Sequence, residues 1–168
     1  SPELVEHIER TVMSYPGVLG VHDLMVHDYG PGHQFASLHV EFPAETDPLT
    51  AHDVIDNIEN DFLKKDRLQV TIHYDPIVTA DASVGVLRAR LKEHARQLDP
   101  RLSIHDLRIV PGDSHTNVLF DLVFPAGYTG DIDQMLAKMC QFVKEQDPKY
   151  CCVVKVEQSY ASALPDKK

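Results

Sequence analysis

The stretch VEFPA at residues 40–44 decides the fold, because nearly the same stretch, LVFPA, returns at residues 122–126. A second stretch repeats at the same interval of about 82 residues: VHDL at 21–24 returns as IHDL at 104–107. Each copy is followed by a helical segment and then by a β-rich run. The repeat therefore covers a whole structural unit and not a single motif.

Working outward from VEFPA, the first copy has the pattern helix, strand, strand, helix, strand. Apolar residues at helical spacing begin the chain and end at a Pro-Gly pair. Asp47 and Pro48 are suited to the cap and first turn of the second helix, and Pro76 is expected to stop the last strand. The expected elements are a helix ending before Pro16, strands near 18–28 and 34–42, a helix near 48–65 and a strand at 68–75.

The second copy has the same pattern. Its expected elements are a helix near 81–98, strands near 102–110 and 117–124, a helix near 130–146 and a strand near 151–159. The fold class is therefore α+β, with two tandem αββαβ units of the split β-α-β type, each a small sheet covered by helices. We expect the first unit at 1–76, a second, degenerate unit at 77–160, and a disordered tail at 161–168.

Composition excludes several classes of partner. The net charge of −10, from 26 acidic and 16 basic residues, argues against nucleic acid, because phosphate contacts require clustered Lys and Arg. No apolar run approaches the ~18–20 residues that span a bilayer, so direct membrane insertion is not expected. The three cysteines are an odd number without a Cys-x-x-Cys pair, which argues against a disulfide framework.

Five residues carry donor groups that first-row divalent metals prefer: His22, His39, His52, His73 and Asp75. Strand alternation places His39, His73 and Asp75 on the polar faces of their strands. His52 lies beside the apolar stripe of its helix. His22 has the parity of the apolar face, so it either begins its strand or follows a bulge. From these residues alone a metal site and a set of exposed histidines both stay open.

In order and spacing these stretches resemble the cytosolic C-terminal domain of a cation diffusion facilitator, in the cation efflux family of zinc transporters. The resemblance covers almost all of residues 1–76 and rests on GVLGVHDL (17–24), LHVE (38–41), AH (51–52) and IHYDP (72–76). It implies a ferredoxin-like, metallochaperone-like dimerisation domain that holds paired divalent ions at the subunit junction. One implied ligand set is His22, His39 and Asp75; the other is His52, His73 and Asp75. Tyr74 departs from the Gln that some members place there.

The resemblance further implies a cytosolic regulatory domain of a zinc-type efflux transporter, without enzymatic activity. The chain would be a fragment of an integral membrane protein, on the cytoplasmic side of the cell membrane. Its partners would be a second copy of itself and the transmembrane domain of its parent chain. Zinc is the first expectation for the metal, and manganese, cobalt, iron, cadmium and nickel stay open.

The second copy keeps few of these donors. His105 matches His22, but we expect Asp121 at the place of His39 and Ser159 at the place of Asp75. Two alternative functions stay open for the chain. One is a metal-independent dimerisation or docking module of the same fold. The other is a binuclear metal hydrolase, against which stands the lack of a clear general base in the same stretches.

Overall fold

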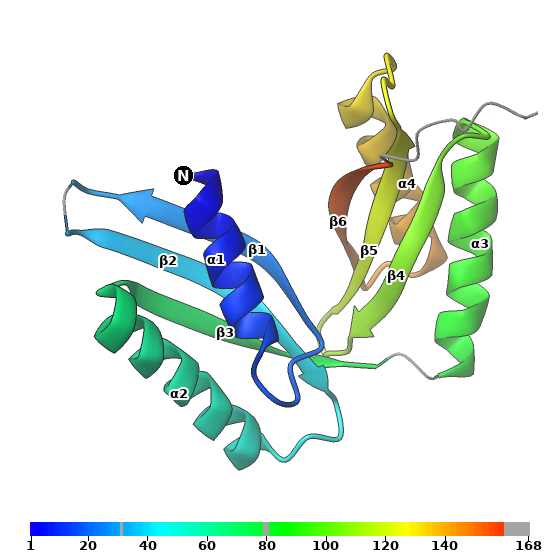
Figure 1. The fold of residues 1–168 in the computed structure, drawn as a ribbon. Coiled ribbons are helices and arrows are strands. Elements are labelled where there is room, and N and C mark those ends of the chain that lie inside the picture. Colours follow the sequence, from blue (N-terminus) through cyan, green and yellow to red (C-terminus); the bar gives the residue numbers. More distant parts are fainter. Residues whose placement is uncertain (31, 79–80, 160–168) are drawn as a thin grey trace, which may run out of the picture. The chain divides into compact units, whose positions relative to one another are not determined.

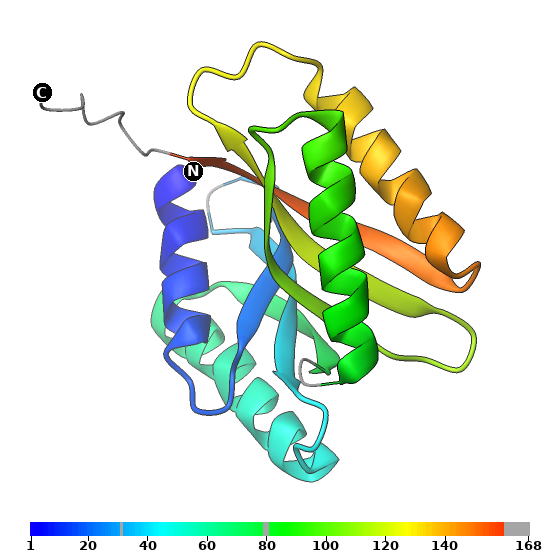
Figure 2. The ribbon, with the colours of Figure 1, turned by 90° about the vertical axis from the view of Figure 1, so that its right-hand side faces the viewer.

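The chain forms two compact units, Ser1–Ile77 and Val78–Lys168. The computed structural model describes residues 1–30, 32–78 and 81–159, so the tail expected at 161–168 lies outside the described residues. The first unit contains α1 (Pro2–Met13), β1 (Gly20–Asp28), β2 (Gln34–Pro43), α2 (Pro48–Asp66) and β3 (Gln69–Ile77) (Figure 1). The second contains α3 (Ala82–Leu98), β4 (Ser103–Val110), β5 (Thr116–Pro125), α4 (Ile132–Gln146) and β6 (Tyr150–Ser159) (Figure 2).

The first sheet has the strand order β1-β2-β3, with β1 and β2 antiparallel and β2 and β3 parallel. Alternation along β2 turns every second residue toward the helices, and these residues are at most 1% exposed: Ala36, Leu38, Val40 and Phe42. They form one core with Ile8 and Val12 of α1 and Ile58 and Phe62 of α2. Both helices therefore cover the same face of the sheet (Figure 1), and no helix among the described residues of this unit lies on the opposite face.

The second unit repeats this arrangement, with the strand order β4-β5-β6, one antiparallel pair and one parallel pair. Helices α3 and α4 cover one face of its sheet (Figure 2), around a core of its own that includes Leu91, Phe120, Phe124 and Met139. The predicted fold class, α+β with two tandem αββαβ units, is confirmed.

The ends of the elements follow local chemistry. The Asp47 carboxylate accepts a hydrogen bond from the Thr50 backbone N–H and caps α2, as predicted. The prediction that Pro76 stops its strand is wrong, because β3 continues to Ile77 with Pro76 paired to Phe42. Proline is tolerated here because β3 is an edge strand, where a missing N–H can face away from the ladder.

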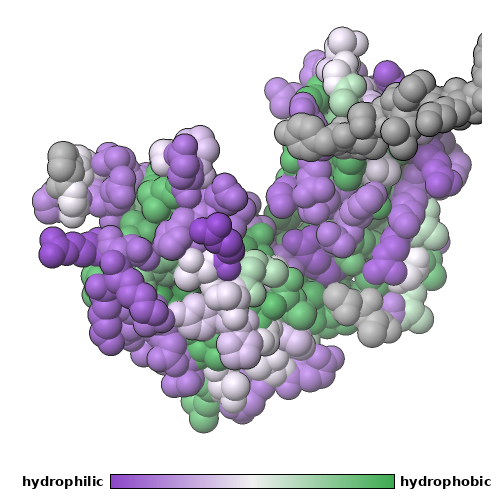
Figure 3. Space-filling view, in the orientation of Figure 1, coloured by the Kyte–Doolittle hydropathy of each residue, from purple (hydrophilic) through white to green (hydrophobic). Residues whose placement is uncertain are grey.

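The two units differ in charge. The first carries 14 acidic and 4 basic side chains, whereas the second carries 12 of each, so the whole net charge of −10 belongs to the first unit. Hydrophilic side chains cover much of the visible surface of each unit (Figure 3). No helix within the described ranges has the length and apolar character that crossing a membrane requires.

Candidate metal centre

A β-bulge in β1 sets the direction of His22. His22 pairs with His39 and Met25 pairs with Ser37, so two residues of β1 lie opposite one residue of β2. The first of these two, Asp23, has the left-handed backbone angle φ of 49° that Asp tolerates better than most residues. The extra residue reverses the alternation, and His22 lies on the face opposite the helices although Leu24 packs against the core. Of the two readings the sequence left open, the bulge is the correct one.

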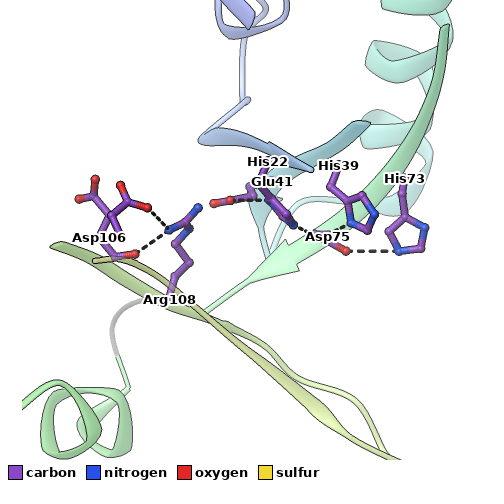
Figure 4. A network of polar contacts seen from close by, with 8 residues as sticks. His22, His39, Glu41, His73, Asp75, Asp106 and Arg108 are labelled. Carbon is purple, nitrogen blue, oxygen red and sulfur yellow. Dashed lines mark hydrogen bonds and ion pairs between the residues drawn. The ribbon is translucent and has the colours of Figure 1, made fainter. Parts of the chain in front are cut away.

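Strand register then brings three imidazoles into one row across the sheet. They lie on the face that α1 and α2 do not cover, here called the open face. His39 of β2 pairs with His22 of β1 on one side and with His73 of β3 on the other. The ring centroids of His22 and His39 are 4.9 Å apart, and those of His39 and His73 are 4.6 Å apart. The row is visible in Figure 4. Residues from three separate segments are therefore neighbours because of pairing alone.

Asp75 joins the three imidazoles. Its Oδ2 lies 3.1 Å from Nε2 of His22 and 3.0 Å from Nδ1 of His39, and its Oδ1 lies 3.3 Å from Nε2 of His73. The Asp75 side chain is 5% exposed, whereas the His73 side chain is 66% exposed. The carboxylate is thus at the buried base of the cluster and the outer imidazole is open to solvent.

Glu41 is a member of this cluster that the sequence analysis did not single out. Its Oε1 accepts a hydrogen bond from Nδ1 of His22 at 2.9 Å, and the residue is 2% exposed. Gly20, its partner across the β1–β2 pair, leaves the room it needs, because a Cβ at that position would meet Oε2 of Glu41 at 2.8 Å. A carboxylate that holds the far nitrogen of an imidazole fixes the ring for metal binding through the other nitrogen.

The carboxylates shift the proton affinity of His22. Burial alone would lower the pKa of this imidazole, but hydrogen bonds to Asp75 and Glu41 and the charges of both carboxylates raise the pKa to about 9. Burial would raise the pKa of Asp75, but hydrogen bonds from His22 and His39 hold the pKa of that carboxyl below its usual range. In the metal-free protein, a proton on His22 offsets part of the negative charge of the cluster.

The donor set fits a divalent ion. Two groups of residues each bring one donor atom apiece within 4.8 Å of one another: His22, Asp23 and His39, and His39, His73 and Asp75. A tetrahedral zinc ion with bonds of ~2.0–2.2 Å separates its ligand atoms by about 3.3–3.6 Å. The distances of 3.0–3.3 Å from Asp75 to the three imidazoles are close to this value. The cluster has the composition and spacing of a histidine–carboxylate metal site.

The remaining candidate, His52, lies on the exposed surface of α2. It is absent from both donor groups found among the described residues, so its role as a ligand stays a prediction. Tyr74 packs against the core, with its ring 5.7 Å from that of Phe42. Tyr74 therefore belongs to the opposite face of the sheet from the imidazoles.

The second unit has a different set of residues at the corresponding places. The register of β5 and β6 pairs Asp121 with Lys155, as the register of β2 and β3 pairs His39 with His73. Lys155 therefore corresponds to His73, and two residues on, Glu157 corresponds to Asp75. The expectation that Ser159 takes the place of Asp75 is wrong, because the strand-to-strand interval is 82 residues and not 84.

The fold and the donor set together define the first unit as a small α+β domain with a histidine–carboxylate site on its open sheet face. Residues 1–77 match the family model of the cation efflux protein, cytoplasmic domain, so the first unit is similar to the members of that family. A solved structure described as the cytosolic domain of a cation diffusion facilitator family protein is similar at 23% sequence identity, with a TM-score of 0.41. The match covers 45% of this chain and 90% of that one. No curated protein matches the sequence.

Proposed function

We propose that this chain is a cytosolic regulatory domain of a divalent-metal efflux transporter, which binds metal in its first unit and uses the ion to tighten a homodimer. The observation that supports this proposal is the single carboxylate of Asp75, which lies within 3.3 Å of three imidazoles. The parent protein would place this domain on the cytoplasmic side of the cell membrane, joined to a transmembrane domain. The name of the family that residues 1–77 match supports that placement.

In the proposed mechanism, Asp75 and the imidazoles of His22, His39 and His73 hold the ion, and Glu41 orients His22. The acidic surface of the first unit raises the local concentration of cations. His73 and His39 are 66% and 35% exposed, so their imidazoles are accessible to a second copy that faces the same surface. An ion that binds better between two facing copies than to separate ones shifts the population toward the closed dimer.

Zinc is the metal that this donor set favours, since imidazole nitrogen and carboxylate oxygen are both among its usual ligands. Manganese, cobalt, iron, cadmium and nickel accept the same donors with different preferences of geometry. His22 would lose its proton when it holds the ion, because only the neutral imidazole is a ligand.

The test is a calorimetric titration of zinc into the metal-stripped chain, with the oligomeric state measured by sedimentation before and after. The His39→Ala, Asp75→Asn double variant removes two donors from the centre of the cluster. The control is His115→Ala, which removes an exposed imidazole of the second unit whose described partner is Ser114. We expect saturable binding and a larger dimer fraction in the parent and the control, and neither in the double variant.

Other results would assign other functions. Dimerisation that is equal in the parent and the double variant, without a response to zinc, would identify a metal-independent dimerisation or docking module. Turnover of a phosphoester that a chelator abolishes would identify a binuclear hydrolase. Zinc binding that is equal in the parent and the double variant would contradict the proposed site.

A further inference from the structure

The second unit keeps the scaffold of the metal site. A bulge in β4 matches the bulge in β1: His105 pairs with Asp121, Arg108 pairs with Leu119, and Asp106 has φ of 50°. By register His105 corresponds to His22, and Asp121 to His39. The open face of the second sheet therefore presents side chains at the same places as the first sheet does, although the side chains differ.

Two of these side chains are cations. Lys155 corresponds to His73, and its Nζ lies 3.4 Å from Oε1 of Glu157, the counterpart of Asp75. Arg108 corresponds to Met25, and its Nη1 lies 3.8 Å from Oδ1 of Asp121. Arg108 is held in place by a hydrogen bond of 2.8 Å from Nη1 to the backbone carbonyl of Asp106 (Figure 4). Each carboxylate of the second face thus has a basic side chain beside it.

Asp121 shows that this charge balance is needed. The residue is 6% exposed, and its Oδ1 is a buried side-chain atom for which the described residues supply no hydrogen-bond donor. Burial and the nearby charge of Glu157 raise the pKa of Asp121, whereas the charges of Arg108 and Lys155 act in the opposite direction. A buried carboxylate of this kind requires a cation close by or remains costly.

These residues do not fit a divalent metal. Both groups of three metal-ligand side chains found among the described residues belong to the first unit. An ammonium group is no ligand while it is charged, and at the place of His73 it would repel a divalent ion. Of the three imidazoles in the row of the first unit, the second unit retains one, that of His105.

We infer that Lys155 and Arg108 take the place of the metal ion in the second unit, so that this face is balanced at every metal concentration and the first unit alone binds metal. The inference rests on the proposed function, because the metal site of the first unit is its template. Asp121 and Lys155 occupy the places of His39 and His73, the two imidazoles of the first row that the second unit lacks.

The test grafts imidazoles of the first site onto the second unit, within the full chain. The background is the His39→Ala, Asp75→Asn variant, which lacks the first site. The graft adds Asp121→His and Lys155→His, which supplies a row of imidazoles beside Glu157. The matched control adds Asp121→Gln and Lys155→Gln instead, which removes the same charges without supplying an imidazole. Zinc affinity is measured by calorimetry, and the absorption spectrum of bound cobalt reports the coordination directly.

We expect no saturable binding in the background or the control. We expect the graft to bind zinc saturably, and to lose this binding when Glu157→Gln is added. The backbone amide spectrum of the second unit checks that each variant is folded. If the double graft does not fold, the single Lys155→His variant applies the same test, because the Lys155 side chain is 56% exposed.

Two results would overturn the inference. In the first, the background retains a saturable metal site that is lost on adding Glu157→Gln, so that the second unit itself binds metal. In the second, the folded graft binds no better than the control. Failure of the proposed function is distinguishable from both, because the unaltered chain would then bind no zinc. The comparison of the graft with the control does not depend on that result, since both lack the first site.

Discussion

The two units have the same fold and the same bulge, but their open faces are chemically opposite. On the first face, a buried Asp75 lies among three imidazoles; on the second, a buried Asp121 lies near Arg108 and Lys155. The residues facing the helices are apolar and buried in both units, whereas the residues on the outward face differ between them. The same scaffold therefore accommodates two different sets of outward side chains without a change of fold.

A further pair of positions supports this division. The first unit has Gly20 opposite Glu41, and the second has Ser103 opposite Val123. Where the carboxylate is replaced by an apolar side chain, the glycine that makes room for it is replaced as well. The two positions change together because Glu41 needs the space in which a Cβ would lie.

The largest expected effect concerns the face on which the units agree. Phe42 and Phe124 occupy the same place in β2 and β5 and are 1% and 0% exposed. Phe42→Ala and Phe124→Ala should each lower the free energy of unfolding of their own unit by ~3–5 kcal/mol, because each leaves a cavity in a packed core. Hydrogen exchange of the sheet amides of each unit measures this. A loss in one unit much smaller than in the other would show that the cores are not equivalent.

The next effect concerns the face on which the units differ. Asp75→Asn should weaken zinc binding on the order of 100-fold, because it removes the carboxylate that all three imidazoles share. Glu157→Gln, at the same place in the second unit, should leave zinc affinity unchanged. Calorimetry on the two single variants gives the comparison, and equal losses would mean that both units bind metal.

A smaller effect is expected from the supporting carboxylate. Gly20→Ala should displace Glu41 and weaken zinc binding about 10-fold, since a side chain that orients a ligand contributes less than the ligand itself. Ser103→Ala is the matched change in the second unit and should have no effect on zinc. If Gly20→Ala also leaves zinc affinity intact, Glu41 does not position His22.

The last effect is gradual and concerns the dependence on pH. The pKa of His22 is about 9 in the metal-free fold against an ordinary 6.5, so the protonated imidazole stabilises this fold fully below pH 6.5. That contribution is lost as the pH rises through about 9. Zinc affinity should change in the opposite direction over the same range, rising up to about tenfold per pH unit as the competing proton leaves.

Urea denaturation of the metal-free chain and zinc calorimetry, both between pH 6.5 and 9, measure the two opposite trends. His22→Gln should flatten both of them, and His105→Gln should leave both unchanged. Trends that run in the same direction would contradict the assignment of a single imidazole to both roles.

The sequence predicted correctly the features that follow from a regular periodic pattern. The alternation in 35–42 placed His39 on the open face, and the repeat predicted both sheets. The sequence did not determine the features that depend on a single residue. The bulge at Asp23 is determined by backbone geometry, and Pro76 is tolerated because the strand order makes β3 an edge. The sequence did contain an indication for Glu41, since alternation places it on the same polar face as His39. Its position opposite Asp75 follows only from the pairing of β2 with β3.

The row of imidazoles has a consequence for the lifetime of the domain, because its members come from three strands that are distant along the chain. An ion bound by all three imidazoles would have to dissociate before any one strand could detach. At a free metal concentration 100 times the dissociation constant, binding to the folded form alone makes the open form about 100-fold rarer. A protease that cuts only the detached strands would therefore degrade the metal-loaded chain more slowly. Under the proposed function, the abundance of the domain would then follow the metal supply.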